Sequence, residues 1–288
     1  MPKDGATVVL PPICHALHFV LGVHPLEQSP GAPLSAEEFV KSFHEALVYS
    51  MFRMMLGRAW NLLPQKKYVD TCAKAHSFVD HYIDQALADR SEQENSRSLI
   101  QALSAQTDPD FIRSQVIQAM IAAQDTTSEL LTNALFLLAR HPKYWEQLRA
   151  EFVGKPADAL SAVNLLILRL YPIFPILGRI ALRDTKLPVG GGSHYDRPMF
   201  VPKGSMVIMS HYALHRDPEV FGEDVEAFRP ERWNSIKPAQ WEFLGFGGGN
   251  RACLGQQKAT IEASYVLARL ARAIDKLESR DSRDWKGS

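Results

Sequence analysis

The sequence predicts a mainly α-helical fold with a small β-rich patch. Apolar residues recur at helical spacing in one segment after another through the first two-thirds of the chain. Beyond Arg169, short runs of β-forming residues alternate with turns that contain Gly and Pro. Helical spacing returns after Cys253, with an apolar stripe that comprises Ile261, Val266, Leu267, Leu270, Ile274 and Leu277. No internal repeat is evident, so we expect a helix-dominated architecture with one strand-rich region.

Four helices are expected in the first part of the chain. The first follows a capping box, Ser-Ala-Glu-Glu at residues 35–38, and the second covers about residues 65–90. The third, residues 109–140, begins with Asp-Pro, in which Asp is the cap and Pro occupies the first turn. The fourth, residues 142–151, also begins at a proline.

The strand-rich region is expected between the fourth helix and Cys253. Short strands are predicted at residues 179–182, 199–201 and 206–211. The three glycines at residues 190–192 are interpreted as a turn. We expect helical structure to return only after Cys253.

Composition excludes several classes of function. The 288 residues carry 32 basic and 32 acidic side chains, so no basic surplus indicates a nucleic-acid partner. The three cysteines, Cys14, Cys72 and Cys253, have no paired spacing, which argues against a disulfide framework or a zinc site and favours an intracellular protein. Residues 8–23 are fairly apolar but are interrupted by prolines and histidines, so we expect neither a membrane anchor nor a secretory signal.

The most informative segment runs from Phe246 to Gly255 and contains Cys253 at the end of a glycine-rich loop. Unpaired N–H groups and the positive end of the following helix would stabilise a thiolate there. Arg251 could reach an acidic group on a bound molecule. A buried free cysteine beside a turn is the alternative. The segment also fits a loose G-x-G-x-x-A nucleotide motif, but the buried strand that this motif requires is not apparent before it.

A polar notch lies in the middle of the third predicted helix. Asp125, Thr126 and Thr127 interrupt an otherwise apolar segment, although their side chains compete with the backbone for hydrogen bonds. The notch indicates a functional role, or else these residues face solvent.

The Cys253 loop resembles the haem-binding loop of the cytochrome P450 family, in which Phe, Gly, Cys and Gly occupy fixed positions. Phe246, Gly249, Cys253 and Gly255 match all four positions. The resemblance implies that Cys253 is the thiolate ligand of the iron of haem b, which favours O–O cleavage.

The segment around the polar notch resembles the oxygen-activation motif of the same family. On that resemblance Thr126 contacts the bound dioxygen and helps to deliver protons, and Asp125 feeds the proton chain. The usual Gly of the motif is Ala123 here.

Two further segments, residues 169–172 and 228–233, resemble family motifs whose two arginines form a buried ion triad with a helix Glu. Position 166, where that Glu is expected, is Leu166, so Arg169 lacks its helical partner. Arg251 and Arg179 are candidates for pairing with haem propionates, because an arginine fork matches a carboxylate. Arg179 is equally consistent with a surface strand residue.

The resemblance implies a partial cytochrome P450 fold, with residues 1–288 as a single partial domain that lacks the N-terminal anchor, the early sheet, the first helices and the last strands. It implies a monooxygenase that receives electrons from an NADPH–cytochrome P450 reductase, since no flavin or nicotinamide motif is present. O2 and a hydrophobic small molecule are the expected substrates. The family location is the cytosolic face of the endoplasmic reticulum membrane, whereas a chain without its anchor is expected in the cytoplasm.

Segments such as those at residues 187–192 and 213–216 resemble the fungal alkane- and fatty-acid-hydroxylating branch, which implies hydroxylation of a long-chain aliphatic substrate. Two alternatives stay open. One is a catalytically inactive, truncated remnant that binds haem weakly or not at all, which Leu166 and the missing ends favour. The other is a helical interaction module in which every motif match is coincidental.

Overall fold

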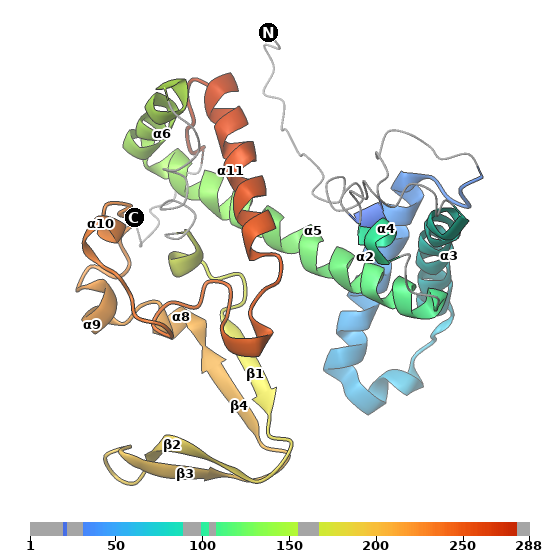
Figure 1. Ribbon diagram of the computed structural model, residues 1–288, viewed down its shortest axis with the longest axis horizontal. Helices are drawn as coiled ribbons and strands as arrows, with labels where there is room; N and C mark the ends of the chain where they lie inside the picture. The colour runs from blue at the N-terminus through green and yellow to red at the C-terminus, as the bar shows by residue number, and fades with distance from the viewer. Residues whose placement is uncertain (1–19, 22–30, 89–98, 104–107, 155–166, 281–288) are drawn as a thin grey trace. The chain divides into compact units, whose positions relative to one another are not determined.

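The computed structural model describes residues 20–21, 31–88, 99–103, 108–154 and 167–280 (Figure 1). The chain forms two compact units, Met1–Ser128 and Glu129–Ser288. Helix α5, Pro109–Arg140, begins in the first unit and continues into the second. None of the described helices is both long enough and apolar enough to cross a membrane.

The described part of the first unit contains helices and connecting turns but no strand. It contains α2 (Ala36–Leu56), the 3-10 helix η1 (Gly57–Leu62), α3 (Lys66–Ala88), α4 (Leu99–Leu103) and the first part of α5. The predicted capping box is confirmed, because the Glu38 N–H donates to Ser35 Oγ at 3.2 Å and the Ser35 N–H donates to Glu38 Oε2 at 3.0 Å. The Asp-Pro start of α5 is also confirmed, since the Asp110 N–H donates to Asp108 Oδ1 at 3.1 Å.

The core of the first unit forms where the apolar faces of its helices meet. Phe39 of α2 stacks on Phe78 of α3 with ring centroids 4.2 Å apart. Val116 and Met120 of α5 are fully buried in the same cluster. The helical spacing of these apolar residues therefore decides which face of each helix is buried.

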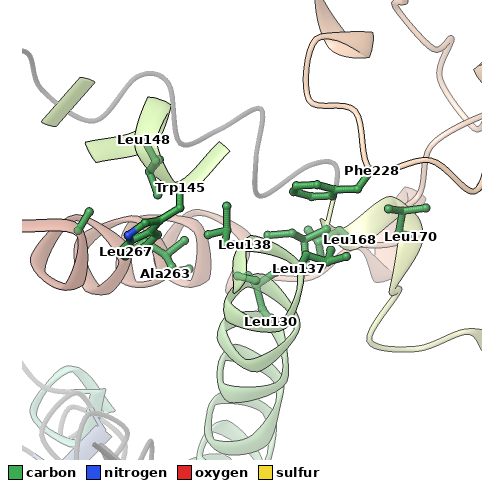
Figure 2. Close-up of a cluster of buried hydrophobic side chains, with 13 residues drawn as sticks. Leu130, Leu137, Leu138, Trp145, Leu148, Leu168, Leu170, Phe228, Ala263 and Leu267 are labelled. Atoms are coloured by element: carbon green, nitrogen blue, oxygen red, sulfur yellow. The ribbon is translucent and has the colours of Figure 1, made fainter. Parts of the chain in front are cut away.

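The core of the second unit packs the rest of α5 with α6 (Pro142–Gly154), α11 (Gln256–Ala273) and a helical segment at residues 167–170. Figure 2 shows leucines of α5 with Trp145 of α6 and Leu267 and Ala263 of α11 in this cluster. The expected break between the third and fourth helices is confirmed at His141. Of the predicted apolar stripe after Cys253, Leu267 is buried in this core and Leu270, Ile274 and Leu277 pack against it. Ile261 is 61% exposed, so the prediction is wrong at this position.

Two antiparallel strand pairs make up the β-rich patch (Figure 1). Strand β1 (Ile176–Ile180) pairs with β4 (Met206–Ser210), and β2 (Thr185–Gly191) pairs with β3 (Arg197–Val201). Strand β2 was not expected, and the prediction of a turn at residues 190–192 is wrong in part, because Gly190 and Gly191 belong to this strand. The irregular register there explains the glycines: Gly190 has φ +108°, and a Cβ on Gly191 would lie 2.6 Å from the Pro198 carbonyl oxygen.

Three short helices precede Cys253, so the expectation that helix returns only after this residue is wrong. They are α8 (His211–Leu214), α9 (Pro218–Phe221) and α10 (Arg232–Ser235). Each has only four residues, and so short a helix shows no apolar periodicity in the sequence. Caps reveal two of them instead, because Ser210 caps α8 and Asp217 caps α9. The predicted class, mainly α with a small β-rich patch, is confirmed.

Replacing Leu267 with Ala should test the packing of α11. Leu267 is 0% exposed, so Leu267→Ala is expected to lower the free energy of unfolding by about 2–5 kcal/mol through lost burial and a residual cavity. Ile261 lies on the same helix but is 61% exposed, and Ile261→Ala should change stability by less than about 0.5 kcal/mol. Urea unfolding followed by circular dichroism measures both, and equal losses would contradict this assignment of the buried face.

Candidate functional site

The Cys253 loop connects the 3-10 helix η3 (Gly249–Arg251) to the start of α11. The Cys253 N–H donates to the Phe246 carbonyl oxygen at 2.9 Å, and the Ala252 N–H donates to the Gly249 carbonyl oxygen at 3.1 Å. The Cys253 side chain is exposed. Its position, three residues before the first residue of α11, agrees with the predicted placement beside a helix N-terminus. The alternative of a buried cysteine is not what the structure shows.

The start of α11 leaves its backbone donors without a side-chain cap. Gly255 occupies the N-cap position and, having no side chain, accepts none of the N–H groups of the first turn. A Cβ built on Gly255 would lie 3.8 Å from Cys253 Sγ, so the thiol is close to this helix end. The sulfur therefore lies beside the unpaired N–H groups and the positive end of the helix dipole.

Glycines shape the loop for two different reasons. Gly247 and Gly249 have φ +71° and +67°, a left-handed conformation that favours glycine. Gly248 is constrained by packing instead, because a Cβ there would lie 2.5 Å from an indole carbon of Trp241. At Gly248 the group that approaches the backbone closely is thus an indole ring of the chain itself.

The other sequence-predicted residues near Cys253 occupy different environments. Phe246 is half-buried and packs against the core of the second unit. Arg251 lies in η3 with an exposed side chain. Arg179 lies on β1, is also exposed, and donates from Nη1 to the Gly178 carbonyl oxygen at 2.9 Å. Exposure leaves both guanidinium groups accessible to an anionic group, and their role toward propionates stays a prediction.

Asp125 and Thr126 lie within α5, which continues through the polar notch without a break. Thr126 Oγ1 donates to the Ala122 carbonyl oxygen at 2.8 Å, so a bond to the preceding turn satisfies its hydrogen. Asp125 is exposed, whereas Thr127 is buried. The notch therefore combines one solvent-facing carboxylate with a partly exposed hydroxyl. Thr126 belongs to the first unit and Cys253 to the second.

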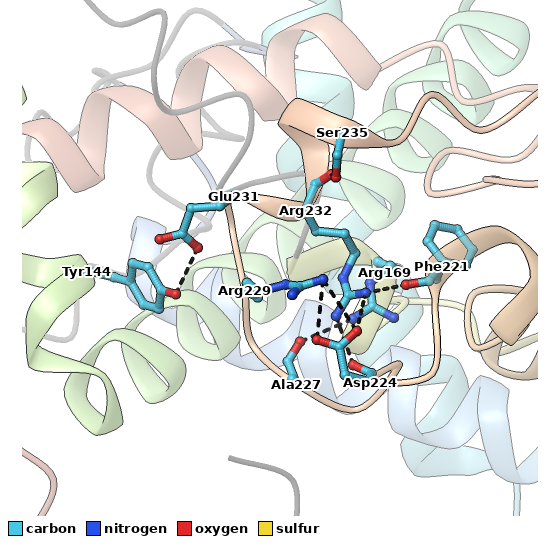
Figure 3. Close-up of polar contacts among 9 residues, drawn as sticks. All are labelled: Tyr144, Arg169, Phe221, Asp224, Ala227, Arg229, Glu231, Arg232 and Ser235. Atoms are coloured by element: carbon cyan, nitrogen blue, oxygen red, sulfur yellow. Dashed lines mark hydrogen bonds and ion pairs between the residues drawn. The ribbon is translucent and has the colours of Figure 1, made fainter.

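Two buried arginines, Arg169 and Arg232, lie in the segments that resemble the triad motifs (Figure 3). Arg232 is 1% exposed and donates from Nη1 to Asp224 Oδ1 at 2.7 Å and from Nη2 to the Asp224 carbonyl oxygen at 2.8 Å. It also donates to the Phe221 carbonyl oxygen. The bond from Arg232 lowers the pKa of the Asp224 carboxyl. Sequence reasoning missed Asp224 as the carboxylate partner of Arg232.

Arg169 makes a different set of hydrogen bonds. It is 0% exposed, and among the described residues no carboxylate forms an ion pair with it. Its Nη1 donates to the His215 carbonyl oxygen at 3.0 Å, its Nη2 donates to the Ala227 carbonyl oxygen at 3.4 Å, and its guanidinium lies over the Phe221 ring. Burial, assisted by the charge of Arg232, lowers the pKa of Arg169 to about 10. Leu166, the expected site of the missing Glu, lies outside the described residues.

These residues fit a haem bound through sulfur. Exposed Cys253 beside a helix N-terminus supplies the soft sulfur ligand that iron accepts in haem–thiolate proteins. Leu254, next in the chain, is fully exposed, and such an apolar side chain suits contact with an apolar macrocycle. Arg251 adds a positive charge in the same loop. The donor set therefore agrees with the cofactor that the sequence predicted.

Comparisons with known proteins give one consistent result. The sequence model of the family described as Cytochrome P450 matches residues 31–275. Cytochrome P450 52A12 of Debaryomyces hansenii is 38% identical over 269 residues, which are 84% of this chain and 52% of that protein. Cytochrome P450 52A3-B of Candida maltosa is 38% identical over 288 residues, or 91% of this chain and 54% of that protein. Cytochrome P450 monooxygenase FPY7 of Fusarium mangiferae is 37% identical, over 87% of this chain and 53% of that protein. The chain spans about half the length of the curated relatives it matches.

Replacing Asp224 with Asn should destabilise the second unit at neutral pH, because buried Arg232 would lose its carboxylate partner. The pKa of Asp224 in the folded state lies below its ordinary value of 3.8, so the ion pair contributes fully above that value and is lost as the pH falls through the lowered pKa. The stability difference between the wild type and Asp224→Asn should therefore shrink on acidification. Urea titrations at several pH values measure it, with the exposed neighbour variant Glu223→Gln as the control. A difference that does not depend on pH would contradict the ion pair.

Replacing Gly248 with Ala should disturb the loop before Cys253. The added Cβ would meet the Trp241 ring at 2.5 Å and Leu244 at 3.2 Å, so overpacking is expected to cost about 1–3 kcal/mol. At Gly178 a Cβ would meet only the Met206 side chain, at 3.8 Å, and Gly178→Ala should change stability little. Thermal unfolding of the two variants compares them directly. Equal stability would show that Trp241 can move away at no cost.

Proposed function

The chain belongs to the cytochrome P450 family, and on this premise we propose that it acts as a haem–thiolate monooxygenase. The reaction would combine a C–H bond of a hydrophobic substrate with O2, two electrons and two protons to give an alcohol and water. The observation that carries the proposal is the exposed Cys253 thiol at the uncapped start of α11.

In this proposal, Cys253 Sγ would hold the iron of haem b, and haem would supply the oxygen chemistry. Phe246, Gly249 and Gly255 form the loop that presents the sulfur. Their backbone supports this role, since the bond from the Cys253 N–H to Phe246 fixes the ligand residue itself. Exposed Arg251 and Arg179 would pair with the propionates through their guanidinium groups.

The polar notch of α5 would move protons. The Thr126 hydroxyl donates to the Ala122 carbonyl oxygen, so its own oxygen stays able to accept a further hydrogen bond. Asp125 is solvent-exposed and can take up protons from water. We propose on the family resemblance that Asp125 is the entry point for protons and that Thr126 passes them on.

The substrate and partner proposals rest on family resemblance. The first relatives named above are yeast cytochromes P450 of one numbered group, which supports the proposed resemblance to the fungal alkane- and fatty-acid-hydroxylating branch and a long-chain aliphatic substrate. An NADPH–cytochrome P450 reductase would supply electrons at the cytosolic face of the endoplasmic reticulum membrane. We also propose that residues 1–288 belong to one cytochrome P450 domain. The alternative of an inactive remnant gains no support from the comparisons.

Carbon monoxide binding to the reduced protein tests the proposal. The chain expressed with a haem supply should give a thiolate-type ferrous–carbon monoxide band, and Cys253→Ala should abolish that band because the sulfur ligand is removed. Cys72→Ala is the matched control, since Cys72 is a partly buried residue of α3, and it should retain the band. A wild-type chain that holds no haem, or a band that survives in Cys253→Ala, would refute the assignment.

A further inference from the structure

His215 is a buried residue that contacts the loop leading to Cys253. It follows α8 directly and is 0% exposed. Its Nε2 accepts a hydrogen bond from the Leu244 N–H at 2.9 Å, and its ring centroid lies 4.8 Å from that of Phe243. The imidazole thus meets the backbone two residues before Phe246, where the Cys253 loop begins.

The hydrogen bond from Leu244 fixes the protonation state of His215. A ring nitrogen that accepts from an N–H carries no hydrogen, so the imidazole is neutral and its single hydrogen is on Nδ1. Burial, with the neighbouring side chains of His211 and Arg169, lowers the pKa of His215 to about 4, although the backbone at Leu168 and Arg169 acts in the opposite direction. The acceptor at Nε2 is therefore present throughout the neutral range.

Backbone hydrogen bonds continue from this contact to the cysteine. The Leu244 carbonyl oxygen accepts from the Gly247 N–H at 3.0 Å, and the Phe246 carbonyl oxygen accepts from the Cys253 N–H at 2.9 Å. On the other side, buried Arg169 donates to the His215 carbonyl oxygen at 3.0 Å. Arg169 thus binds the backbone of His215, and the His215 side chain binds the backbone of Leu244. His215 therefore connects the buried arginine to the segment that leads into the Cys253 loop.

We propose that His215 is a positioning residue of the Cys253 loop, whose neutral imidazole fixes Leu244 and with it the turn that presents the thiol. This inference deepens the proposed haem–thiolate function and rests on it. The imidazole acts through Leu244 and does not itself touch haem or substrate. A side chain of similar size without an acceptor would keep the packing on Phe243 but release the Leu244 N–H.

Two variants separate the acceptor from the packing. His215→Phe keeps an aromatic ring and removes the acceptor, whereas His215→Gln supplies an amide oxygen that accepts a hydrogen bond and does not titrate. Native-state hydrogen exchange of the Leu244 amide should become about five- to tenfold faster in His215→Phe, as expected for the loss of one hydrogen bond, and stay near the wild-type rate in His215→Gln. Amides in the middle of α11 serve as the internal control and should be unchanged in both variants.

The pH dependence of hydrogen exchange at the Leu244 amide distinguishes a hydrogen bond to the imidazole from a purely packing role of His215. Protection of Leu244, corrected for the intrinsic exchange rate, should fall in the wild type as the pH drops through about 4, because protonated Nε2 can no longer accept. It should not fall in this way in His215→Gln. The fraction of protein with the thiolate-type carbon monoxide band should decrease in His215→Phe and recover in His215→Gln.

Each outcome decides the proposal. Unchanged protection of Leu244 in His215→Phe, or equal loss of protection in both variants, would overturn it. If His215→Phe does not fold, the comparison of His215→Gln with the wild type decides. Protection of Leu244 in His215→Gln that equals the wild-type level at neutral pH and does not fall near pH 4 supports the role. Loss of Leu244 protection in His215→Gln at neutral pH refutes it. Hydrogen exchange needs no haem, so a failure of the haem–thiolate proposal is distinguished from a failure of the positioning role.

Discussion

Two arginine side chains buried in the second unit must find acceptors away from water, and the chain between β4 and Cys253 is arranged around this requirement. Arg232 obtains a carboxylate from Asp224 and carbonyl oxygens from the turn around it, whereas Arg169 obtains carbonyl oxygens from His215 and Ala227. An unpaired buried charge would cost several kcal/mol, a large share of the stability of a domain. The irregular path of this segment is therefore explained by the guanidinium groups that it surrounds.

The same arrangement extends to the thiol. The carbonyl group of His215 accepts a hydrogen bond from Arg169, and its ring accepts one from the Leu244 N–H. This one buried residue therefore links the buried arginines to the segment that leads into the Cys253 loop. In the loop itself, left-handed glycines and the bond from Cys253 to Phe246 determine the backbone. Reactive chemistry at a single sulfur needs such support, because a ligand on a freely moving loop would be held in no defined position.

The sequence was a good guide where structure is local. The capping box at Ser35, the Asp-Pro start of α5 and the break at His141 were all predicted, because caps and proline act within one turn. It was a poor guide to β2 and to the three short helices. The ladder of β2 includes glycines that resemble a turn, and helices of four residues have no periodicity to read.

By itself, the sequence determined the family, the helix-dominated class and the residue that carries the proposed chemistry, since the motif around Cys253 is contiguous and its spacing is preserved in the chain. Only the tertiary structure decided that Asp224 pairs with Arg232, that Trp241 covers Gly248 and that His215 meets Leu244. No periodicity, cap or motif relates the positions that these contacts join. Buried Arg232 and His215 need hydrogen-bond partners away from water, and their burial follows from how the segments pack rather than from their order along the chain.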